Sequence, residues 1–364
     1  MSDTQAEKIV CLILCAGKGT RMRPLTYTRP KQLLPIGNRV VIDHILAGVK
    51  RTGIRDVCLV VDPDAKALRA HVKAHRPAGL RFRFVVQPKP DGIADAVERA
   101  KRVVGERAFI VCLGDAFYGD QMVDFVDRFV REYPRSLVRL HALPDPRQYG
   151  VAKLAEDSRI IKVREKPERP PTNLAITGLY GFPHWFYRAI EATEPDKTGE
   201  RQITSAIAAF LSSEHGVYGE EYEGLWADAG RPSMVLEANA AVLNGLNGRV
   251  CFSAQIVGAE PPPGVAVGAR SRVEKCRFRG PVLIGRKCVL VNATIKGPCS
   301  INDGAVITNS TICTSIVDRD AHIEKMGAGL IDSIIGIGAE VKGGGKGSGV
   351  RSVVVGDYAR LRFD

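Results

Sequence analysis

Residues 8–36 read KIVCLILCAGKGTRMRPLTYTRPKQLLPI, and this stretch decides the fold of the amino-terminal part of the chain. Lys8–Leu14 is an apolar run that predicts a buried first strand. Gly17 and Gly19 follow, and glycines placed after a strand let backbone N–H groups approach phosphate oxygens that a Cβ would block. The spacing is neither G-x-G-x-x-G, because residue 22 is Met22, nor a P-loop, because no Gly-Lys-Ser/Thr is present. The glycine pair alone is therefore a weak sign of phosphate binding.

Two cations make the same stretch more informative. Arg21 and Lys31 stand on one predicted loop, where they can clamp a triphosphate as its charge redistributes. The alternative is that both are solvated surface side chains, as in most Arg/Lys pairs.

The residues from the first strand to about residue 245 alternate short apolar runs with amphipathic ones, which is typical of an open α/β sheet. We expect helices over Val40–Arg51 and Ile93–Val104, where apolar residues recur at helical spacing. The predicted strands after the first are Val57–Val61, Phe82–Val86 and Phe109–Leu113. The order strand, helix, strand implies mostly parallel pairing with right-handed crossovers.

After about residue 248 a repeat replaces the helical periodicity. Its units open on an aliphatic residue followed by Gly, Asn or Asp, at intervals of 17, 17, 16, 20 and 18 residues: Val267-Gly268, Ile284-Gly285, Ile301-Asn302, Val317-Asp318, Ile337-Gly338 and Val355-Gly356. Three hexapeptides per turn favour a triangular parallel β-helix, with a β-sandwich as the alternative. We therefore expect two domains, residues 1–247 and 248–364.

Composition excludes several classes of protein. With 364 residues, 45% hydrophobic and 25% charged, the chain has the composition of a globular protein, and no apolar run reaches the roughly 20 residues of a membrane helix. No signal segment opens it, so we expect a cytoplasmic protein without membrane contact. The nine cysteines form no C-x-x-C pair, and we expect neither disulfides nor zinc.

The net charge of +12 is consistent with an anionic ligand. Nucleic acid is disfavoured as that ligand, because the basic residues are spread along the chain, aromatic residues are only 6%, and no zinc-finger spacing is present. A small polyphosphate substrate would use the same positive field.

The stretch Gly17-Lys18-Gly19-Thr20-Arg21, continued by Pro24-Leu25-Thr26 and Pro30-Lys31-Gln32-Leu33-Leu34-Pro35, resembles the signature of the sugar-1-phosphate nucleotidylyltransferases. The resemblance covers nearly the whole chain and is closest to glucose-1-phosphate thymidylyltransferases of the long form, with uridylyltransferases as near neighbours. Further segments appear in the family's order: Gln87-Pro88-Lys89-Pro90-Asp91-Gly92, Gly114-Asp115, Tyr149-Gly150-Val151, Glu165-Lys166-Pro167, Thr177-Gly178-Leu179-Tyr180, Gly199-Glu200-Arg201-Gln202 and Trp226-Ala227-Asp228-Ala229-Gly230.

The resemblance implies a Rossmann-like nucleotidyltransferase domain with a mostly parallel sheet, followed by a left-handed parallel β-helix. It also implies a set of site residues. The nucleotide site comprises Leu14, Ala16, Gly17, Gly19, Thr20, Arg21, Gln87, Pro90, Gly92 and Asp115; the sugar-phosphate site comprises Tyr149, Gly150, Glu165, Lys166, Gly178 and Tyr180; Asp115 and Asp228 hold Mg²⁺. Arg21 and Lys31 are the catalytic cations.

The expected reaction transfers a nucleotidyl group from dTTP to a sugar-1-phosphate, with glucose-1-phosphate as the first candidate. A sugar phosphate is already an anion, so the reaction needs positioning and charge neutralisation but no general base. UTP is the alternative donor, since one methyl group is worth only about 1–3 kcal/mol. We expect a homo-oligomer with small-molecule substrates, because an open-ended solenoid needs its faces or ends covered.

Three departures from the family pattern leave other interpretations open. Ala116 replaces the usual Asn after Gly-Asp, Gln202 stands where Glu is commoner, and Cys15 stands where Ala or Gly is usual. A non-catalytic regulatory or assembly subunit of the same fold is therefore an alternative. An acetyltransferase activity of the β-helix is a second, with His322 as the only histidine of the repeats.

Overall fold

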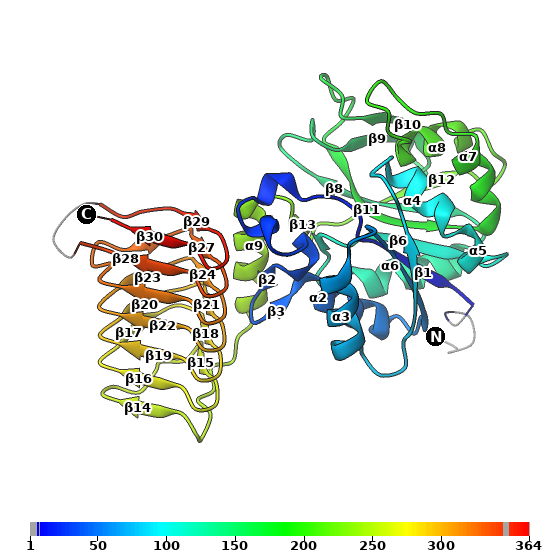
Figure 1. Ribbon diagram of the computed structural model, residues 1–364. Helices are drawn as coiled ribbons and strands as arrows, with labels where there is room; N and C mark the ends of the chain where they lie inside the picture. Colours follow the sequence, from blue (N-terminus) through cyan, green and yellow to red (C-terminus); the bar gives the residue numbers. More distant parts are fainter. Residues whose placement is uncertain (1–5, 7, 345–348, 364) are drawn as a thin grey trace. The chain divides into compact units, whose positions relative to one another are not determined.

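The structure is a computed structural model that describes residues 6, 8–344 and 349–363. The chain forms two compact units that interleave along the sequence (Figure 1). Met1–Gly17 and Ile42–Trp226 form the first, called here the sheet unit. Lys18–Val41 and Ala227–Asp364 form the second, called here the β-helix unit. The signature stretch is thus divided between them, and the domain boundary at residue 247 stays a prediction.

The sheet unit contains one mixed sheet in the order β10-β9-β11-β6-β1-β4-β5, with β8 paired to β11 and β12 paired to β8. Its strands are β1 (Val10–Leu14), β4 (Asp56–Val61), β5 (Arg81–Val86), β6 (Phe109–Leu113), β8 (Ser136–Ala142), β9 (Gly150–Leu154), β10 (Ile160–Glu165), β11 (Leu174–Phe182) and β12 (Val217–Glu221); β7 (Ala116–Phe117) lies outside it. Strand β1 runs parallel to both β4 and β6, and β4 runs parallel to β5. The four predicted strands are therefore confirmed, and β11 begins the antiparallel half.

The helices of the sheet unit are α2 (Val41–Arg51), α3 (Lys66–His75), α4 (Ile93–Arg99), α5 (Lys101–Val104), α6 (Gln121–Glu132), α7 (Tyr187–Glu191) and α8 (Ile203–Phe210), with a 3-10 turn at His184–Phe186. The prediction of one helix over Ile93–Val104 is wrong in one respect, because Ala100 separates α4 from α5. The N–H of Ala100 bonds to the carbonyl of Val97, three residues back, which tightens the end of α4.

Buried apolar side chains explain why these elements form one sheet unit. All five residues of β1 are buried, as a strand covered on both faces requires. Phe182 at the end of β11 stacks on Phe186, with ring centroids 3.8 Å apart. No helix among the described residues is long and apolar enough to cross a membrane.

The β-helix unit stacks short parallel strands in three sheets (Figure 1). The first contains β14 (Gln255–Val257), β16 (Arg272–Glu274), β19 (Val289–Val291), β22 (Val306–Thr308), β25 (His322–Glu324), β28 (Glu340–Lys342) and β30 (Arg360–Arg362). The second contains β15 (Val265–Val267), β18 (Val282–Ile284), β21 (Cys299–Ile301), β24 (Ile316–Val317), β27 (Ile334–Ile335) and β29 (Val354–Val355). The third contains β17 (Arg277–Arg279), β20 (Thr294–Lys296), β23 (Thr311–Cys313) and β26 (Leu330–Ile331). The predicted parallel β-helix is confirmed.

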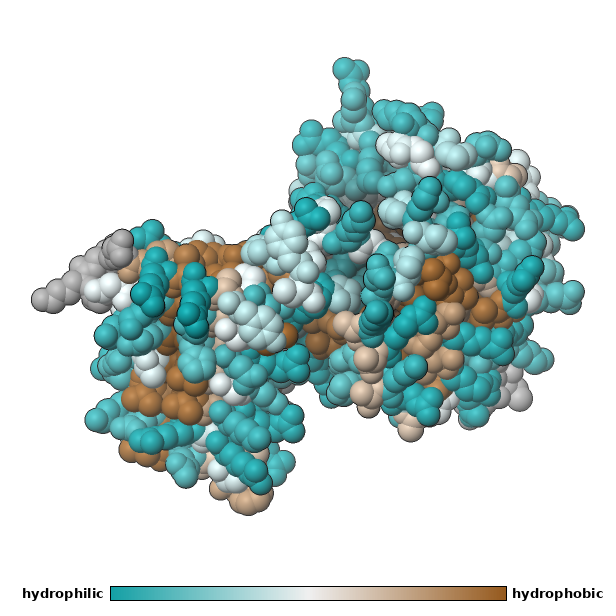
Figure 2. Space-filling view, viewed as in Figure 1, coloured by the Kyte–Doolittle hydropathy of each residue, from teal (hydrophilic) through white to brown (hydrophobic). Residues whose placement is uncertain are grey.

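The corners of the coils show why the repeat has its period. Lys275, Asn292, Asn309 and Lys325 occupy one corner of successive coils, and each has a positive φ between 50° and 58°. The Asn292 side-chain amide donates to Asn309 Oδ1 at 2.8 Å, so a hydrogen bond joins the corners of two successive coils. Inside, aliphatic side chains form a continuous core. Figure 2 shows hydrophobic residues between hydrophilic ones along the stacked coils.

The rest of the β-helix unit consists of residues 18–41, called here the signature loop, and the segment 227–254. It contains three 3-10 turns, Thr20–Met22, Leu25–Tyr27 and Lys31–Leu33, the short strands β2 (Pro35–Ile36), β3 (Arg39–Val40) and β13 (Ala227–Asp228), and helix α9 (Pro232–Leu243). Met22, Leu25, Leu34 and Ile36 are fully buried. The loop is therefore a packed part of this unit.

Candidate active site

The structure brings one predicted cation and one predicted metal ligand together in the β-helix unit. Arg21 Nη2 lies 3.9 Å from Asp228 Oδ2. The Arg21 side chain is 58% exposed and that of Asp228 15%, so the guanidinium can turn toward a ligand. Asp228 Oδ1 accepts the N–H of Gly230 at 2.8 Å, which fixes the orientation of the carboxylate.

Lys31 lies beside Gly19, although eleven residues lie between them in the sequence. A Cβ at Gly19 would lie 3.5 Å from Lys31 Cβ and 3.2 Å from Thr26 Cγ2. Gly19 has φ +58°, and the Thr26 hydroxyl donates to its carbonyl at 2.7 Å. The loop therefore folds back on itself. One compact turn contains the Lys31 side chain and the backbone of Gly19 and Thr20, which is predicted to bind phosphate.

In the sheet unit, Leu14 is the last residue of β1, and Ala16 and Gly17 follow it at the strand end where open α/β sheets bind ligands. The Gly17 N–H donates to both carboxylate oxygens of Asp62, each at 3.2 Å. The Gly17 N–H, which was predicted to bind a phosphate oxygen, therefore already donates to a carboxylate of the protein. Sequence reasoning missed Asp62, although it directly follows β4 at the same sheet edge.

Asp115 follows β6 at this edge and is 8% exposed. Gly114 before it cannot carry a side chain, because a Cβ would lie 2.5 Å from Cys15 Sγ and 2.9 Å from the Leu14 carbonyl oxygen. Its N–H donates to that carbonyl at 2.8 Å. The Gly-Asp pair therefore holds the Asp115 backbone close to the end of β1, and Cys15 is buried there.

Tyr118 ties this segment to Gly178 of the predicted sugar-phosphate site. Its hydroxyl accepts the Leu113 N–H at 2.8 Å and donates to the Gly178 carbonyl at 3.0 Å. Burial raises the pKa of Tyr118 well above its usual value, so the group stays a neutral phenol that can donate. No motif in the sequence distinguished this tyrosine.

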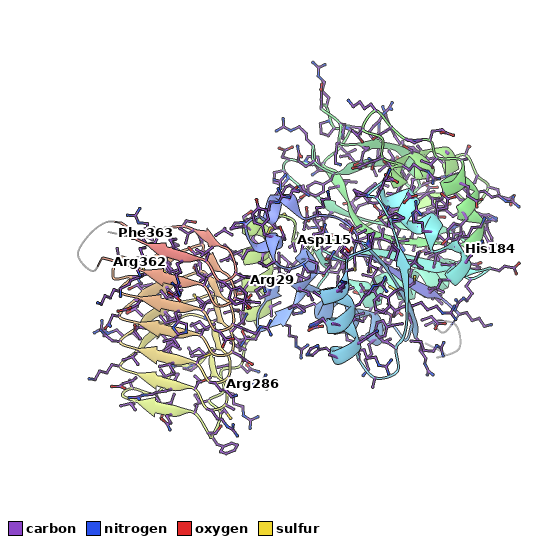
Figure 3. All side chains as sticks on the ribbon, in the orientation of Figure 1. Arg29, Asp115, His184, Arg286, Arg362 and Phe363 are labelled. Atoms are coloured by element: carbon purple, nitrogen blue, oxygen red, sulfur yellow. The ribbon has the colours of Figure 1, made fainter. Side chains whose placement is uncertain are left out.

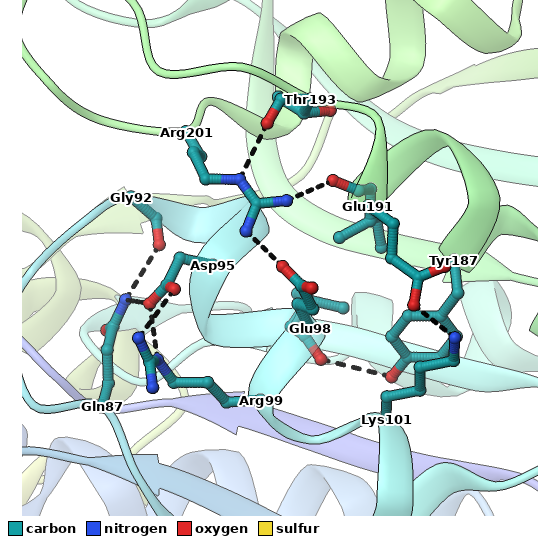
Figure 4. A network of polar contacts seen from close by, with 12 residues as sticks. Gln87, Gly92, Asp95, Glu98, Arg99, Lys101, Tyr187, Glu191, Thr193 and Arg201 are labelled. Carbon is teal, nitrogen blue, oxygen red and sulfur yellow. Dashed lines mark hydrogen bonds and ion pairs between the residues drawn. The ribbon is translucent and has the colours of Figure 1, made fainter.

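Gln87 is held in one orientation (Figure 4). Its Nε2 donates to the Gly92 carbonyl at 3.0 Å and to Asp95 Oδ2 at 2.8 Å. Both partners are acceptors, so the NH₂ group must face them, and Oε1 points the other way. Arg99 holds the Asp95 carboxylate with two bonds of 2.8 and 3.0 Å.

The backbone of Arg201 packs against the segment that carries Pro90 and Gly92. The Arg201 N–H donates to the Asp91 carbonyl at 2.8 Å, and the Arg201 carbonyl accepts the Ala94 N–H at 3.0 Å. Gly92 has φ +102°, and a Cβ there would lie 2.3 Å from the Arg201 carbonyl oxygen. This position therefore requires glycine for both its conformation and its close approach.

The structure brings the predicted sugar-phosphate residues of β9 and β10 together. Glu165 pairs with Gly150 in the sheet register, and Lys166 Nζ lies 3.4 Å from Glu165 Oε1. The Thr204 hydroxyl donates to Glu165 Oε2 at 3.0 Å, and a Cβ at Gly150 would lie 2.7 Å from Thr204 Cγ2. Thr204, which the sequence analysis did not assign, therefore orients the carboxylate.

The two predicted tyrosines differ in their surroundings. Tyr149 packs edge-on against Trp226 with ring centroids 5.3 Å apart. Tyr180 is 3% exposed within the core and stacks on Phe182. Burial and the nearby Glu165 carboxylate raise the pKa of Tyr180, so its hydroxyl stays protonated.

The departure at Gln202 has a physical explanation. The Gln202 Nε2 donates to Asp196 Oδ2 at 3.2 Å and to Glu200 Oε2 at 3.0 Å. A glutamate in its place would face two carboxylates, whereas the amide satisfies both. Hydrogen bonds from Thr198 lower the pKa of Asp196, which keeps that carboxylate ionised. Ala116 is buried in β7, and its small side chain leaves no polar group at that position.

The donor set is compatible with magnesium. Among the described residues, no group of three or more His, Cys, Asp or Glu side chains forms a protein-only metal cage. Magnesium typically takes one or two carboxylates, with phosphate oxygens and water completing its shell. Asp115 in the sheet unit and Asp228 in the β-helix unit are carboxylates of this kind.

The chain matches the family model described as nucleotidyl transferase over residues 10–245, and it belongs to that family. A glucose-1-phosphate thymidylyltransferase of Streptomyces griseus is 32% identical over 357 residues, covering 97% of this chain and 99% of the relative. A glucose-1-phosphate thymidylyltransferase of Streptomyces antibioticus is 31% identical over 362 residues, with the same coverage. The family and the enzyme class predicted from the sequence are thus confirmed.

Solved structures share the fold of the chain. A structure described as a glucose-1-phosphate thymidylyltransferase from Bacillus anthracis, in complex with sucrose, has a TM-score of 0.60 and 28% identity, covering 66% of this chain and 98% of that one. A UDP-glucose pyrophosphorylase complexed with UDP-glucose has a TM-score of 0.58 at 24% identity, covering 64% and 97%. The second similarity shows the shared fold alone.

Proposed function

We propose that this nucleotidyltransferase transfers a nucleotidyl group from dTTP to glucose-1-phosphate, releasing pyrophosphate and forming dTDP-glucose. An oxygen of the sugar phosphate attacks the α-phosphorus, and the bond to the β-phosphate breaks. Lys31 neutralises charge that develops at the α-phosphate, and Arg21 binds the triphosphate. Lys166 binds the sugar phosphate, while the Glu165 carboxylate accepts hydrogen bonds from sugar hydroxyls.

Asp115 and Asp228 are the residues that would hold Mg²⁺. When bound, the ion supplies charge neutralisation to the reacting phosphates. The Gly230 N–H fixes the Asp228 carboxylate. Arg21 lies close to Asp228, so its guanidinium can bind the same phosphates as the ion.

The orientation of Gln87 is the observation that carries the choice of nucleotide. Because Nε2 is engaged by Gly92 and Asp95, the amide presents Oε1 as an acceptor. An acceptor matches the imide N3–H of thymine or uracil, whereas cytosine in the same pose presents N3, itself an acceptor. A polar mismatch of this kind discriminates more strongly than a methyl group, so UTP is the expected second donor.

The experiment is pyrophosphate release by the purified protein with Mg²⁺, using dTTP, UTP, GTP, ATP and CTP, each with several sugar-1-phosphates. We expect dTTP with glucose-1-phosphate to give the highest turnover, followed by UTP. A maximum at UTP would move the donor assignment but keep the base-recognition argument. A maximum at CTP would contradict that argument, and a folded protein inactive with every pair would favour the regulatory-subunit alternative.

The β-helix is also the basis for a proposal about oligomeric state. Its stacked strands end in coils whose backbone groups need covering, so we propose that copies of the chain associate through it. Light scattering of the intact protein measures this, and a monomer at micromolar concentration would contradict it. A cytoplasmic location stays a prediction.

A further inference from the structure

A buried ion cluster links the signature loop to the coils of the β-helix unit. Arg29 Nη2 lies 2.7 Å from Asp318 Oδ2 and 3.1 Å from Asp357 Oδ1. The Arg29 side chain is 8% exposed and each aspartate side chain 3%. Asp318 follows β24 and Asp357 closely follows β29, so the carboxylates belong to different coils.

The two carboxylates are themselves fixed by the coils. Asp357 Oδ1 accepts the Ile337 N–H at 2.9 Å, and Asp318 Oδ1 accepts from the Asn302 amide at 3.0 Å. Neither carboxylate can follow Arg29 freely if the loop moves. A guanidinium between two fixed, buried carboxylates is in turn held in place, because leaving would strand two unpaired charges.

Neighbouring contacts also attach the signature loop to the coils. The Thr28 hydroxyl donates to Asp357 Oδ2, and a Cβ at Gly356 would lie 3.2 Å from Pro24 Cβ. At the other end of the loop, the Gly37 N–H donates to Asn239 Oδ1 of α9, which also accepts from the Ser300 hydroxyl of β21. The loop is thus attached to the coils on both sides of Lys31.

We infer that Arg29, Asp318 and Asp357 form a positioning cluster through which the β-helix fixes Arg21 and Lys31 for nucleotidyl transfer. Arg29 is two residues before Lys31, and the Gly19 turn connects Lys31 to the segment carrying Arg21. Restraint at Arg29 therefore restrains both cations. This inference rests on the roles proposed above for Arg21 and Lys31.

The test compares Arg29→Met with Arg286→Met as a matched control. Arg286 also pairs with an aspartate of the β-helix, at 2.8 and 2.9 Å from Asp303 Oδ2, but its side chain is 73% exposed. Figure 3 shows the two arginines at separate places of this unit. Each variant is measured for kcat, for KM of both substrates, for melting temperature and for hydrogen exchange of the peptides covering residues 18–41.

We expect Arg29→Met to lower kcat about tenfold to hundredfold, with KM of the sugar phosphate changed less than about threefold, because misplaced charges act on the transition state. Hydrogen exchange in residues 18–41 should rise. Arg286→Met should leave all four measurements near wild type. A kcat of Arg29→Met within about twofold of wild type would overturn the inference.

A triple variant separates positioning from stability. Arg29→Met with Asp318→Asn and Asp357→Asn removes every charge of the cluster, and a neutral replacement of buried ion pairs is commonly tolerated. We expect its melting temperature to recover above that of Arg29→Met, while kcat stays low. Recovery of kcat as well would show that the charges serve stability alone. If Arg29→Met does not fold, Asp357→Asn and the triple variant carry the same comparison.

Failure of the proposed function is distinguishable from failure of this inference. Wild-type protein without turnover for any substrate pair would refute the former. The exchange measurement needs no substrate, and it would still refute the anchoring if residues 18–41 exchanged equally in wild type and Arg29→Met.

Discussion

Replacing Gln87 by glutamate tests the base-recognition argument most directly. In Gln87→Glu a carboxylate would stand where Nε2 now lies 2.8 Å from Asp95 Oδ2 and 3.0 Å from the Gly92 carbonyl. The buried glutamate can escape this repulsion by binding a proton. From an ordinary Glu pKa of about 4.3, protonation at pH 7 costs about 4 kcal/mol, which sets the upper limit of the electrostatic destabilisation.

The sign of the pH dependence follows from the raised pKa in the folded state. The folded form binds a proton that the unfolded form lacks, so the variant gains stability relative to wild type as pH falls. By pH 5 the electrostatic cost is limited to about 1 kcal/mol. A further ~1 kcal/mol should remain at every pH, because one O–H replaces two N–H donors.

The assay is urea unfolding followed by tryptophan fluorescence at pH 7 and pH 5. Trp185 and Trp226, the two tryptophans of the chain, both lie in the sheet unit, so the signal reports the part that contains Gln87. Adding Asp95→Asn to Gln87→Glu should remove most of the loss at pH 7, since the repelling charge is gone. If Gln87→Glu is as stable as wild type at pH 7, the orientation assigned to the amide is wrong.

Two further predictions concern catalysis and backbone geometry. Lys31→Ala and Asp115→Ala should each lower pyrophosphate release about 100-fold or more, with melting temperatures near wild type, and turnover within a few-fold would contradict their roles. Gly178→Ala should lose about 2–4 kcal/mol in urea unfolding, because a Cβ would lie 2.4 Å from Leu113 Cδ1 at φ +82°. Gly199 is the control, because it has φ +83° and no atom beyond its chain neighbours lies within 4 Å of a Cβ. Gly199→Ala should lose only about 1–2 kcal/mol, and equal losses would refute the steric argument.

Local patterns predicted most of the fold because burial imposes periodicity directly on the sequence. Lys8–Leu14 and Phe109–Leu113 are apolar runs typical of central strands, and the aliphatic residue that opens five of the six repeat units is buried in the coils. The prediction at Ile337 is wrong, because Ile335 pairs with Val317 and Val355 and lies in the core instead. The break at Ala100 was missed since no Gly or Pro marks it. Its cause is a change from one hydrogen-bonding pattern to another, which leaves no trace in residue type.

The candidate site was predicted less completely, because orientation depends on residues that carry no motif. Gln87 was predicted to bind the nucleotide, but Asp95, which accepts from its amide, and Arg99, which holds Asp95, look in the sequence like an ordinary helical ion pair. Asp62 acts on Gly17 through one backbone N–H that both of its carboxylate oxygens accept, and Thr204 acts on Glu165 through a single hydrogen bond. Such partners are set by tertiary packing, which spacing alone does not determine.

The signature stretch illustrates the same limit most sharply. In the sequence it is one continuous motif, yet in the structure Gly17 is held by Asp62 of the sheet unit, and the residues from Lys18 onward pack in the β-helix unit. Thr28 and Asp357, which share a hydrogen bond, are 329 residues apart. At the corners of the repeat an Asp is one of the ordinary residues, so nothing distinguishes Asp318 from Gly268 or Asn302 until Arg29 is placed against it. Asp318 and Asp357 therefore bond to neighbouring coils and also pair with a charged residue of the loop.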